Sequence, residues 1–254
     1  MKFKFNLRRE LKIIAAIVVA VGIIAFTERR QGDVAIRDIT VKIDNQQGNY
    51  FLDESDIMDM MPFKKENLAG RHIDSVNLKG IESKIRKQPF IAKADLYSDL
   101  KGNLVVRAEL RRPIARIVRN DGPDGYIAED GTIMPVSEKF TSRVILVSGN
   151  YIPKILRQKN MNDDSESKQI LDMIYKIRDN EFWSAQIAQL DIDGKARVTL
   201  FPQVGDEKIE FGKPDDLDVK FRKLMIFYKE ILPRKGWNKY NRVNLEYDGQ
   251  IVTE

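Results

Sequence analysis

The sequence predicts an α+β protein in which two folded domains follow an apolar N-terminal segment. Three observations support this prediction. Residues 13–26 carry no charge, residues 35–110 mix strand and helix patterns, and the later residues form short apolar runs separated by turn signals. With 254 residues, of which 43% are hydrophobic and 32% are charged, the chain has room for one large domain or two small ones.

The apolar run IIAAIVVAVGIIAF predicts a single transmembrane helix over residues 13–27. With Leu11 and Thr27 its usable length reaches about 17 residues, the lower limit for crossing a bilayer. Basic residues dominate the preceding tail, so the positive-inside rule places residues 1–12 in the cytoplasm and the bulk of the chain outside the membrane. The expected anchor consists of these side chains: Ile13, Ile17, Val21, Ile24 and Phe26.

A cleaved signal peptide is the alternative interpretation of this segment. The basic start fits a signal peptide, but the exit AFTERRQGD has no clear A-x-A cleavage site before its charges. An uncleaved anchor is therefore the favoured interpretation, and it puts the folded part of the protein in a periplasm or an equivalent space.

The net charge of +5 comes mostly from the N-terminal tail. The first twelve positions hold five of the 43 basic residues and one of the 38 acidic residues, so the rest of the chain is close to neutral. A nucleic-acid binder carries its positive excess on the folded body, so we expect no nucleic-acid partner. The absence of cysteine excludes disulfides, thiolate metal sites and a cysteine nucleophile.

The first domain is predicted from alternating strand and helix signals. AIRDITVKID reads as a strand, and LDESDIMDMM as a short helix with Asp53 as its N-cap and Pro62 closing it. A second helix is expected between Ser75 and Gln88, and the strands IAKADLY and NLVVRAEL follow. This order of strand, helix, helix, strand and strand is typical of a compact α+β unit.

The chain after Pro113 predicts a mainly antiparallel β domain with packed helices on one side. The short strands PIARIV, GYIAED, TIMPV, RVILVSG and KIEFG are separated by turn signals such as NDGPDG, and IAQLDIDGKARVTLFP reads as a hairpin turning at Asp193–Gly194. A helix is expected over 168–178, and a second over 218–232 that ends at Gly236. The second helix should bury these side chains: Phe221, Leu224, Met225, Tyr228, Ile231 and Leu232.

The final stretch NRVNLEYDGQIVTE predicts a strand at the end of the sheet, because Val243, Leu245 and Tyr247 alternate with polar residues. A two-residue turn at Asp248–Gly249 would fold the last residues back as a hairpin, whereas a bulge would continue one strand. The hairpin is favoured. Either arrangement leaves a sheet edge, which proteins usually protect from pairing with other chains.

No pattern predicts a catalytic site, a metal site or a cofactor. His72 is the only histidine and has no second ligand nearby, so it reads as a solvated residue. SESK at Ser165–Lys168 lacks the accompanying S-D-N and K-T-G motifs, DIDG at Asp191–Gly194 lacks the spacing of a calcium loop, and no phosphate-binding glycine loop occurs. We therefore expect no small-molecule substrate.

Two surface features remain open at this stage. A basic cluster surrounds the predicted domain junction, and a solvated strand face is favoured over contact with an anionic partner. Trp183 in NEFWSAQI is expected to be a packing residue. The cluster consists of Arg107, Arg111, Arg112, Arg116 and Arg119.

Taken in order, these segments resemble the FtsQ/DivIB family of bacterial cell-division proteins. NLKGIESKIRKQPFIAKADLY resembles part of the POTRA-like unit of that family, and KFRKLMIFYKEIL and YNRVNLEYDGQIV resemble its closing helix and strands. LVVRAELRRPIARI resembles the E-R-x-P-x-A stretch through Glu109, Arg111 or Arg112, Pro113 and Ala115. YIAEDGTIMPVS resembles the tyrosine-to-glycine hairpin through Tyr126, Asp130 and Gly131.

The resemblance implies a non-enzymatic protein of the inner membrane at the division septum, which links early and late division proteins. The implied layout is a cytoplasmic tail (1–12), a transmembrane helix (13–27), a linker (28–35), a POTRA-like domain (36–112) and an FtsQ-type β domain (113–254). The POTRA-like domain would dock other divisome membrane proteins. The final strands would receive FtsB, which travels with FtsL, by β-augmentation.

The implied partner-binding residues lie in the terminal stretch. Glu246 stands where the family often has a basic residue, which leaves open whether the charge pairing with a partner is reversed in this chain. The set consists of Arg242, Val243, Leu245, Tyr247, Gln250, Ile251 and Val252.

Two other functions compete with the scaffold hypothesis. A POTRA-type protein that handles polypeptides in transport or envelope assembly is the main alternative, although such proteins usually repeat the POTRA unit and one unit is visible here. An envelope enzyme acting on cell-wall polymer would need paired carboxylates in a cleft, and no spacing singles out such a pair.

Overall fold

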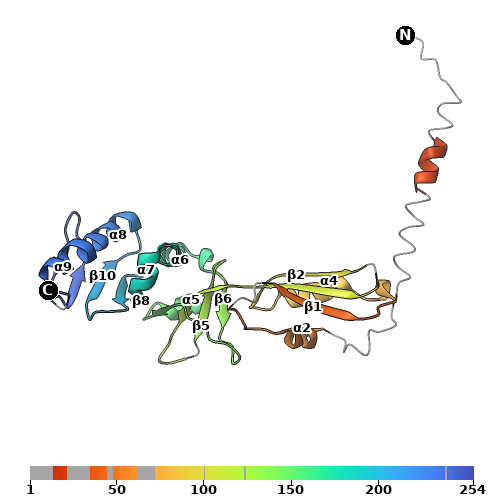
Figure 1. Ribbon diagram of the computed structural model, residues 1–254, viewed down its shortest axis with the longest axis horizontal. Coiled ribbons are helices and arrows are strands. Elements are labelled where there is room, and N and C mark those ends of the chain that lie inside the picture. The colour runs from red at the N-terminus through yellow and green to blue at the C-terminus, as the bar shows by residue number, and fades with distance from the viewer. Residues whose placement is uncertain are drawn as a thin grey trace, which may run out of the picture. The chain divides into compact units, whose positions relative to one another are not determined.

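The computed structural model describes residues 14–21, 35–44, 48–61, 72–99, 101–122, 124–237 and 239–254 (Figure 1). The described residues form two compact units. The first holds the segments up to Asp44 and from Asp53 to Glu109, and the second holds Gly48–Leu52 and Leu110–Glu254.

Residues 14–21 are helical and their side chains are exposed. Within the ranges given above, every helix is too short or too polar to cross a bilayer. The expected anchor lies only partly in these ranges, because Ile17 and Val21 belong to this helix while Ile13, Ile24 and Phe26 lie outside the described residues.

The first unit has the predicted element order. Its three-stranded sheet runs β1 (Ile39–Asp44), β3 (Leu104–Leu110), β2 (Ile91–Ser98), and β1 is parallel to β3. Two helices, α2 (Glu54–Met60) and α4 (Leu78–Arg86), and a 3-10 turn, η1 (Ile73–Ser75), connect the strands. α4 packs on β2 through Ile81 and Ile85, which are buried one turn apart.

Local capping explains where α2 begins. The carboxylate of Asp53 accepts the N–H of Asp56 at 2.9 Å, and the carboxylate of Asp56 accepts the N–H of Asp53 at 2.8 Å. This reciprocal pair satisfies two of the amide groups that a helix start leaves open. The predicted N-cap at Asp53 is therefore confirmed, while Pro62, the predicted stop, lies outside the described residues.

The second unit forms a sheet of nine described strands in the order β12-β11-β10-β9-β8-β7-β4-β5-β6. The strands predicted from PIARIV to KIEFG are all present. Their bounds are β4 (Pro113–Ile117), β5 (Gly125–Ala128), β6 (Ile133–Pro135), β7 (Ile145–Ser148), β8 (Ile187–Ile192), β9 (Val198–Pro202), β10 (Lys208–Gly212), β11 (Arg242–Asn244) and β12 (Val252–Thr253).

This sheet is mainly antiparallel, as predicted, but it also contains parallel pairings that the sequence did not predict. Five of its eight pairings are antiparallel, but β4 with β7, β7 with β8 and β10 with β11 run parallel. Parallel neighbours need a long crossover connection. Helices supply that crossover between β7 and β8 and again between β10 and β11.

The first helical crossover contains more elements than the sequence predicted. It holds α5 (Ile152–Leu156), the 3-10 turn η2 (Met161–Asp163), α6 (Ser165–Arg178) and α7 (Glu181–Gln186). The helix predicted over 168–178 begins earlier because Asp164 accepts the N–H of Ser167 at 3.0 Å. Trp183 on α7 is buried and packs against Phe182 and Phe221, which confirms its predicted packing role.

The second crossover is the predicted C-terminal helix, interrupted by a π-helical turn. It consists of α8 (Leu217–Ile226), the π segment η3 (Phe227–Ile231) and α9 (Leu232–Lys235), and Figure 1 shows it beside β10. The extra residue of a π turn shifts the buried face of a helix. Phe227, absent from the predicted inward set, is therefore buried, whereas Met225 and Ile231 are partly exposed.

The same turn brings Tyr228 against a buried carboxylate. Its hydroxyl donates to Glu207 Oε1 at 2.9 Å, and both residues are almost fully buried. Burial, followed by the nearby charge of Glu207, raises the pKa of Tyr228 well above its usual range, so this hydroxyl stays protonated.

Residues 48–52 belong to the second unit although they lie between β1 and α2 in the sequence. Phe51 is 1% exposed, and its ring lies edge-on to Tyr126 and Phe140 with centroids 5.2 and 5.1 Å away. The side-chain amide of Asn49 donates to the carbonyl of Arg111 at 2.7 Å. This short segment therefore completes the core of a unit that begins about sixty residues later by sequence position.

We expect Phe51→Ala to lower the free energy of unfolding of the second unit by about 3–5 kcal/mol, because it leaves a cavity between two aromatic rings. Trp183 and Trp237 both lie in that unit, so the tryptophan fluorescence of the purified chain in urea measures this loss. Tyr50→Ala, at the more exposed neighbour, is the matched control and should cost less than about 1 kcal/mol. Equal losses for both variants would contradict the assignment of Phe51 to the core.

Candidate functional site

One end of the nine-stranded sheet is the candidate site. β12 pairs with β11 in antiparallel fashion, with Val243 opposite Thr253 and Asn244 opposite Val252. β11 in turn runs parallel to β10, with Val243 opposite Ile209. Within the described residues β12 has no strand on its other side, so it is the edge of the sheet.

The chain reaches this edge by a wide turn rather than the predicted two-residue turn. β12 does fold back on β11, as the hairpin interpretation requires, but residues 245–251 all lie in the loop. Leu245 still donates its N–H to the carbonyl of Glu210 at 2.9 Å. The ammonium of Lys223 on α8 donates to the carbonyls of Leu245 and Tyr247 at 2.7 and 2.8 Å. Lys223 thus binds two carbonyl groups that, in a tight hairpin, would accept hydrogen bonds from the opposite strand.

The backbone of Thr253 faces the open side of the sheet. Glu254 donates its N–H to the carbonyl of Arg242 at 3.0 Å and accepts the N–H of Arg242 at 3.3 Å. In an antiparallel pair, alternate residues direct both backbone groups to the same neighbour. Glu254 therefore faces β11, while the N–H and C=O of Thr253 point outward, where another strand could pair.

A charged cluster on one face fixes the three terminal strands in register. Arg242 on β11 forms a two-pronged pair with Glu210 on β10, with Nε–Oε1 at 2.7 Å and Nη2–Oε2 at 2.8 Å. Its Nη1 also lies 3.0 Å from Oε1 of Glu254, beside β12. Asn244 donates to Glu210 Oε2 at 2.6 Å. A guanidinium that meets a carboxylate by two parallel bonds gives both attraction and geometric specificity.

The bonds in this cluster shift the pKa values of Glu210 and Arg242. The hydrogen bond from Arg242 lowers the pKa of Glu210, burial opposes that lowering, and the bond from Asn244 adds to it. The carboxylates of Glu210 and Glu254 raise the pKa of Arg242. Glu210 and Arg242 are therefore both charged at neutral pH.

A shallow hollow of about 60 Å³ lies on the same face of the edge. Tyr247 is 55% exposed and Val252 is 37% exposed, so the hollow combines apolar surface with a charged margin. Exposed aromatic side chains beside an open strand are typical of protein-binding surfaces. The lining consists of Arg242, Asn244, Tyr247, Val252 and Glu254.

The structure separates the seven predicted partner-binding residues into three groups. Val243 and Leu245 are fully buried, so their side chains belong to the core. Ile251 is partly buried and packs against that core. The exposed members are Arg242, Tyr247, Gln250 and Val252.

Four further residues of this site were not identified from the sequence. Glu210 and Lys223 come from β10 and α8, and nothing in the local sequence links them to the terminal stretch. Asn244 and Glu254 alternate with the predicted core residues, so the strand pattern itself could have placed them on the exposed face.

The basic cluster at the predicted domain junction consists mostly of separate ion pairs. Arg107 contacts Asp44 at 2.6 Å, and in the second unit Arg111 contacts Asp130 at 3.4 Å. Two more pairs are Arg116 with Asp124 at 2.9 Å and Arg119 with Asp121 at 3.1 Å. These acidic neighbours leave little net positive charge for an anionic partner.

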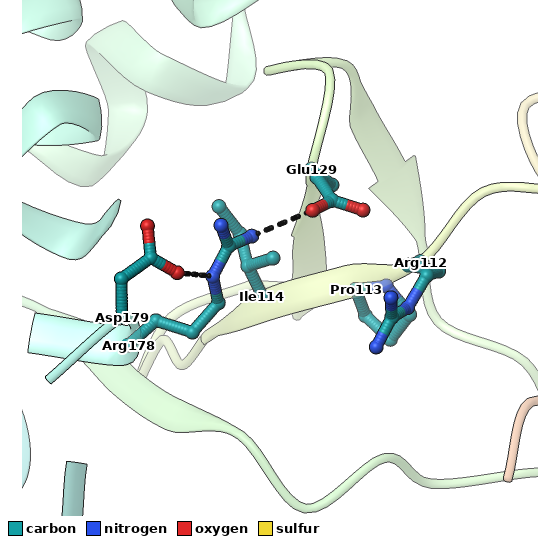
Figure 2. Close-up of a pocket in the computed structure, with 6 residues that line it drawn as sticks. All are labelled: Arg112, Pro113, Ile114, Glu129, Arg178 and Asp179. Atoms are coloured by element: carbon teal, nitrogen blue, oxygen red, sulfur yellow. Dashed lines mark hydrogen bonds and ion pairs between the residues drawn. The ribbon is translucent and has the colours of Figure 1, made fainter. Parts of the chain in front are cut away.

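The exposed fifth member, Arg112, lines a hollow of about 340 Å³ (Figure 2). Figure 2 shows Arg178 reaching between Asp179 and Glu129, while Arg112 lies apart from that group beside Pro113. The bonds from Arg178 measure 2.6 Å to Asp179 and 3.0 Å to Glu129. The bond to Asp179 is the main cause that raises the pKa of Arg178. Both carboxylates are thus engaged by one guanidinium.

A larger hollow of about 580 Å³ lies at the carboxyl ends of the parallel strands β4, β7 and β8. Ligands often bind at such ends in mixed sheets. Here, Ser148 donates to Asp191 at 2.7 Å, Gln189 donates to Ser148 at 2.8 Å, and Asp193 pairs with Arg197 at 2.8 Å. Ser148, Gln189 and Asp191 thus form a short chain of hydrogen bonds along this hollow.

The remaining sequence motifs also have structural explanations. Ser165 and Lys168 are exposed in the first turn of α6. Asp193 accepts the N–H groups of Lys195 and Arg197, which confirms the predicted hairpin turn. His72 is exposed and forms an isolated bridge with Ala35. The described part of the chain contains no group of three His, Cys, Asp or Glu side chains that could hold a metal ion.

Comparison with known proteins finds matches to both folded units. A family model described as "FtsQ/DivIB, C-terminal related" matches residues 112–254, and a model of the POTRA-like domain matches residues 35–109. The cell division protein FtsQ of Syntrophotalea carbinolica is 24% identical over 177 residues, which cover 69% of this chain and 62% of that protein. The chain thus spans about six tenths of the length of this curated relative.

We expect Glu210→Gln to lower the free energy of unfolding by about 1 kcal/mol at pH 7, because it removes the two-pronged pair with Arg242. Since the pKa of Glu210 is lowered in the folded state, its contribution is present above the unfolded value of about 4.3. It is then lost as the pH falls through the lower folded value. Urea unfolding at a series of pH values should show the difference between variant and wild type shrinking in acid.

Glu138→Gln is the control for this experiment, because Glu138 is exposed beside β6 at the opposite end of the sheet. It should match the wild type at every pH. A deficit in Glu210→Gln that stayed constant from neutral to acidic pH would show that the ion pair is not its cause.

Proposed function

The chain belongs to the FtsQ/DivIB family, and on that premise we propose that it is a non-enzymatic cell-division scaffold whose sheet edge at β12 binds another division protein. The observation that carries this proposal is the outward-facing backbone of Thr253 on an edge strand. A strand from a second chain would extend the sheet there by β-augmentation, with main-chain bonds for affinity and side-chain contacts for specificity.

The rigidity of the edge supports this use. Arg242 ties β11 to β10 and to Glu254, and Lys223 holds the loop that precedes β12. A short edge strand that is already ordered loses little conformational freedom when a partner binds. The edge also carries exposed apolar surface at Tyr247 and Val252, which a partner would cover.

We propose FtsB and FtsL-like division proteins as the partners at this edge. The 24% identical relative is itself a cell division protein, which supports placement of this chain in the same process at the division septum. The POTRA-like unit would dock other divisome membrane proteins. The match to the FtsQ/DivIB family model supports a binding role rather than catalysis.

The proposed location is the inner membrane, with the tail 1–12 in the cytoplasm, an anchor helix over 13–27, a linker over 28–35 and the remainder in the periplasm. The uncharged run and the basic tail support this topology. The proposed domain bounds, 36–112 and 113–254, lie close to the two family-model matches. The FtsQ/DivIB match after a single POTRA-like match favours the scaffold over a POTRA-type transport or envelope-assembly protein.

We expect Thr253→Pro to weaken FtsB binding by tenfold or more. Proline removes the outward N–H and its ring obstructs an incoming strand, whereas the bonds between Arg242 and Glu254 stay in place. Binding would be measured by titrating the partner segment onto the purified full chain, with a thermal melt to establish folding. Thr253→Val keeps the N–H and is the matched control.

Tyr247→Ala should also weaken this binding, because it removes exposed aromatic surface beside the edge. Folded Thr253→Pro and Tyr247→Ala variants that bind FtsB as the wild type does would refute the terminal edge as the binding site.

The topology has its own test. Protease added to intact spheroplasts should digest the part of the chain after residue 28, because that part lies outside the inner membrane in the proposed arrangement. A cytosolic marker protein should survive the same treatment. A chain that is protected until the cells are lysed would place the folded units in the cytoplasm and would refute the proposed location.

A further inference from the structure

We propose that the strand received at β12 carries a lysine or arginine side chain that pairs with Glu254. This inference rests on the proposed function and adds the chemical character of the partner. It follows from the distribution of charge around the edge and from the face on which Glu254 lies.

The terminal segment is acidic. Residues 245–254 contain three carboxylates and no basic side chain. The three carboxylates belong to exposed residues, so a partner can reach them without unfolding the loop. They are Glu246, Asp248 and Glu254.

The nearest cations offset this charge only in part: Lys223 lies against the loop, and Arg197 interacts electrostatically with Glu246 and Glu210. Arg242 contacts two carboxylates, those of Glu210 and Glu254, so the three-residue group has a net charge of −1. Lys223 is bound to the carbonyls of Leu245 and Tyr247 and therefore sits against the loop backbone. The side chain of Glu254 forms one ion pair with Arg242, through Oε1, and is 64% exposed.

The strand geometry determines which partner side chains meet Glu254. Side chains of Arg242, Asn244, Val252 and Glu254 share one face, since they line the same hollow. A residue directly opposite on an added strand would have its Cβ roughly 5 Å from that of its neighbour on this face. Opposite charges stabilise such a cross-strand pair, and like charges destabilise it.

A long basic side chain could also lie along this face. The methylene stem of a lysine or arginine could lie along Val252 and the ring of Tyr247, with its charged head at Glu254. An acidic partner residue at this position would meet Glu254 and the negative charges of the loop. The edge therefore selects a basic strand by attraction and rejects an acidic one by repulsion.

Two synthetic β-strand peptides test the inference. They have the same alternating threonine and valine sequence and differ only in central residues, which are lysine in one and glutamate in the other. Fluorescence anisotropy would measure their binding to the purified full chain at low salt. We expect the lysine peptide to bind about fivefold or more tightly than the glutamate peptide, with the preference decreasing at high salt.

Variants of the chain then assign the preference to one residue. Glu254→Gln should reduce it and Glu254→Lys should reverse it, while Glu138→Gln, at the other end of the sheet, removes the same charge and should leave it unchanged. Equal binding of both peptides to the wild type, or a preference that survives Glu254→Lys, would overturn the inference.

Thr253→Pro separates this inference from the proposed function. If it abolishes binding of both peptides while the wild type binds them equally, the edge is the docking site and only the charge inference falls. If neither peptide binds the wild type, or if Thr253→Pro leaves binding unchanged, the edge does not receive strands and both proposals fall.

Discussion

The guanidinium of Arg242 is the contact on which the end of the sheet depends. It meets Glu210 on β10 by two bonds and Glu254 by a third, so one side chain connects three successive strands. β11 and β12 are only three and two residues long, and so few main-chain bonds would hold them weakly. The ion cluster compensates for this short length and fixes which backbone groups of β12 face outward.

The helical segment before β11 also determines the structure of this edge. A parallel partner for β10 requires the chain to cross over, and the helical segment from Leu217 to Lys235 makes that crossing. Its π turn places Phe227 and Tyr228 in the core, while Lys223 reaches the loop carbonyls. This one helical segment therefore sets both the core packing and the geometry of the edge. A change that rotated its buried face would alter both.

The sequence predicted local features of the fold better than contacts between distant parts of the chain. Asp53 and Gly236 were predicted correctly because caps depend on a few adjacent residues. The parallel strand pairings were not predicted, since they depend on strands that lie far apart in the chain. Val243 and Leu245 were expected at the partner surface but lie in the core, because alternation shows two faces and does not say which is buried. Glu210 joins the site only through the fold.

The placement of Phe51 makes the chain hard to divide. A fragment starting at Leu110 would contain all nine strands of the large sheet and still lack the aromatic ring that fills the space between Tyr126 and Phe140. During synthesis Phe51 leaves the ribosome well before Tyr126 and Phe140, so it cannot pack against them until they have also been made. A fragment truncated at Leu110 would therefore lack part of the core of the second unit. A fragment that represents the intact unit must include residues 48–52, for instance through a circularly permuted gene.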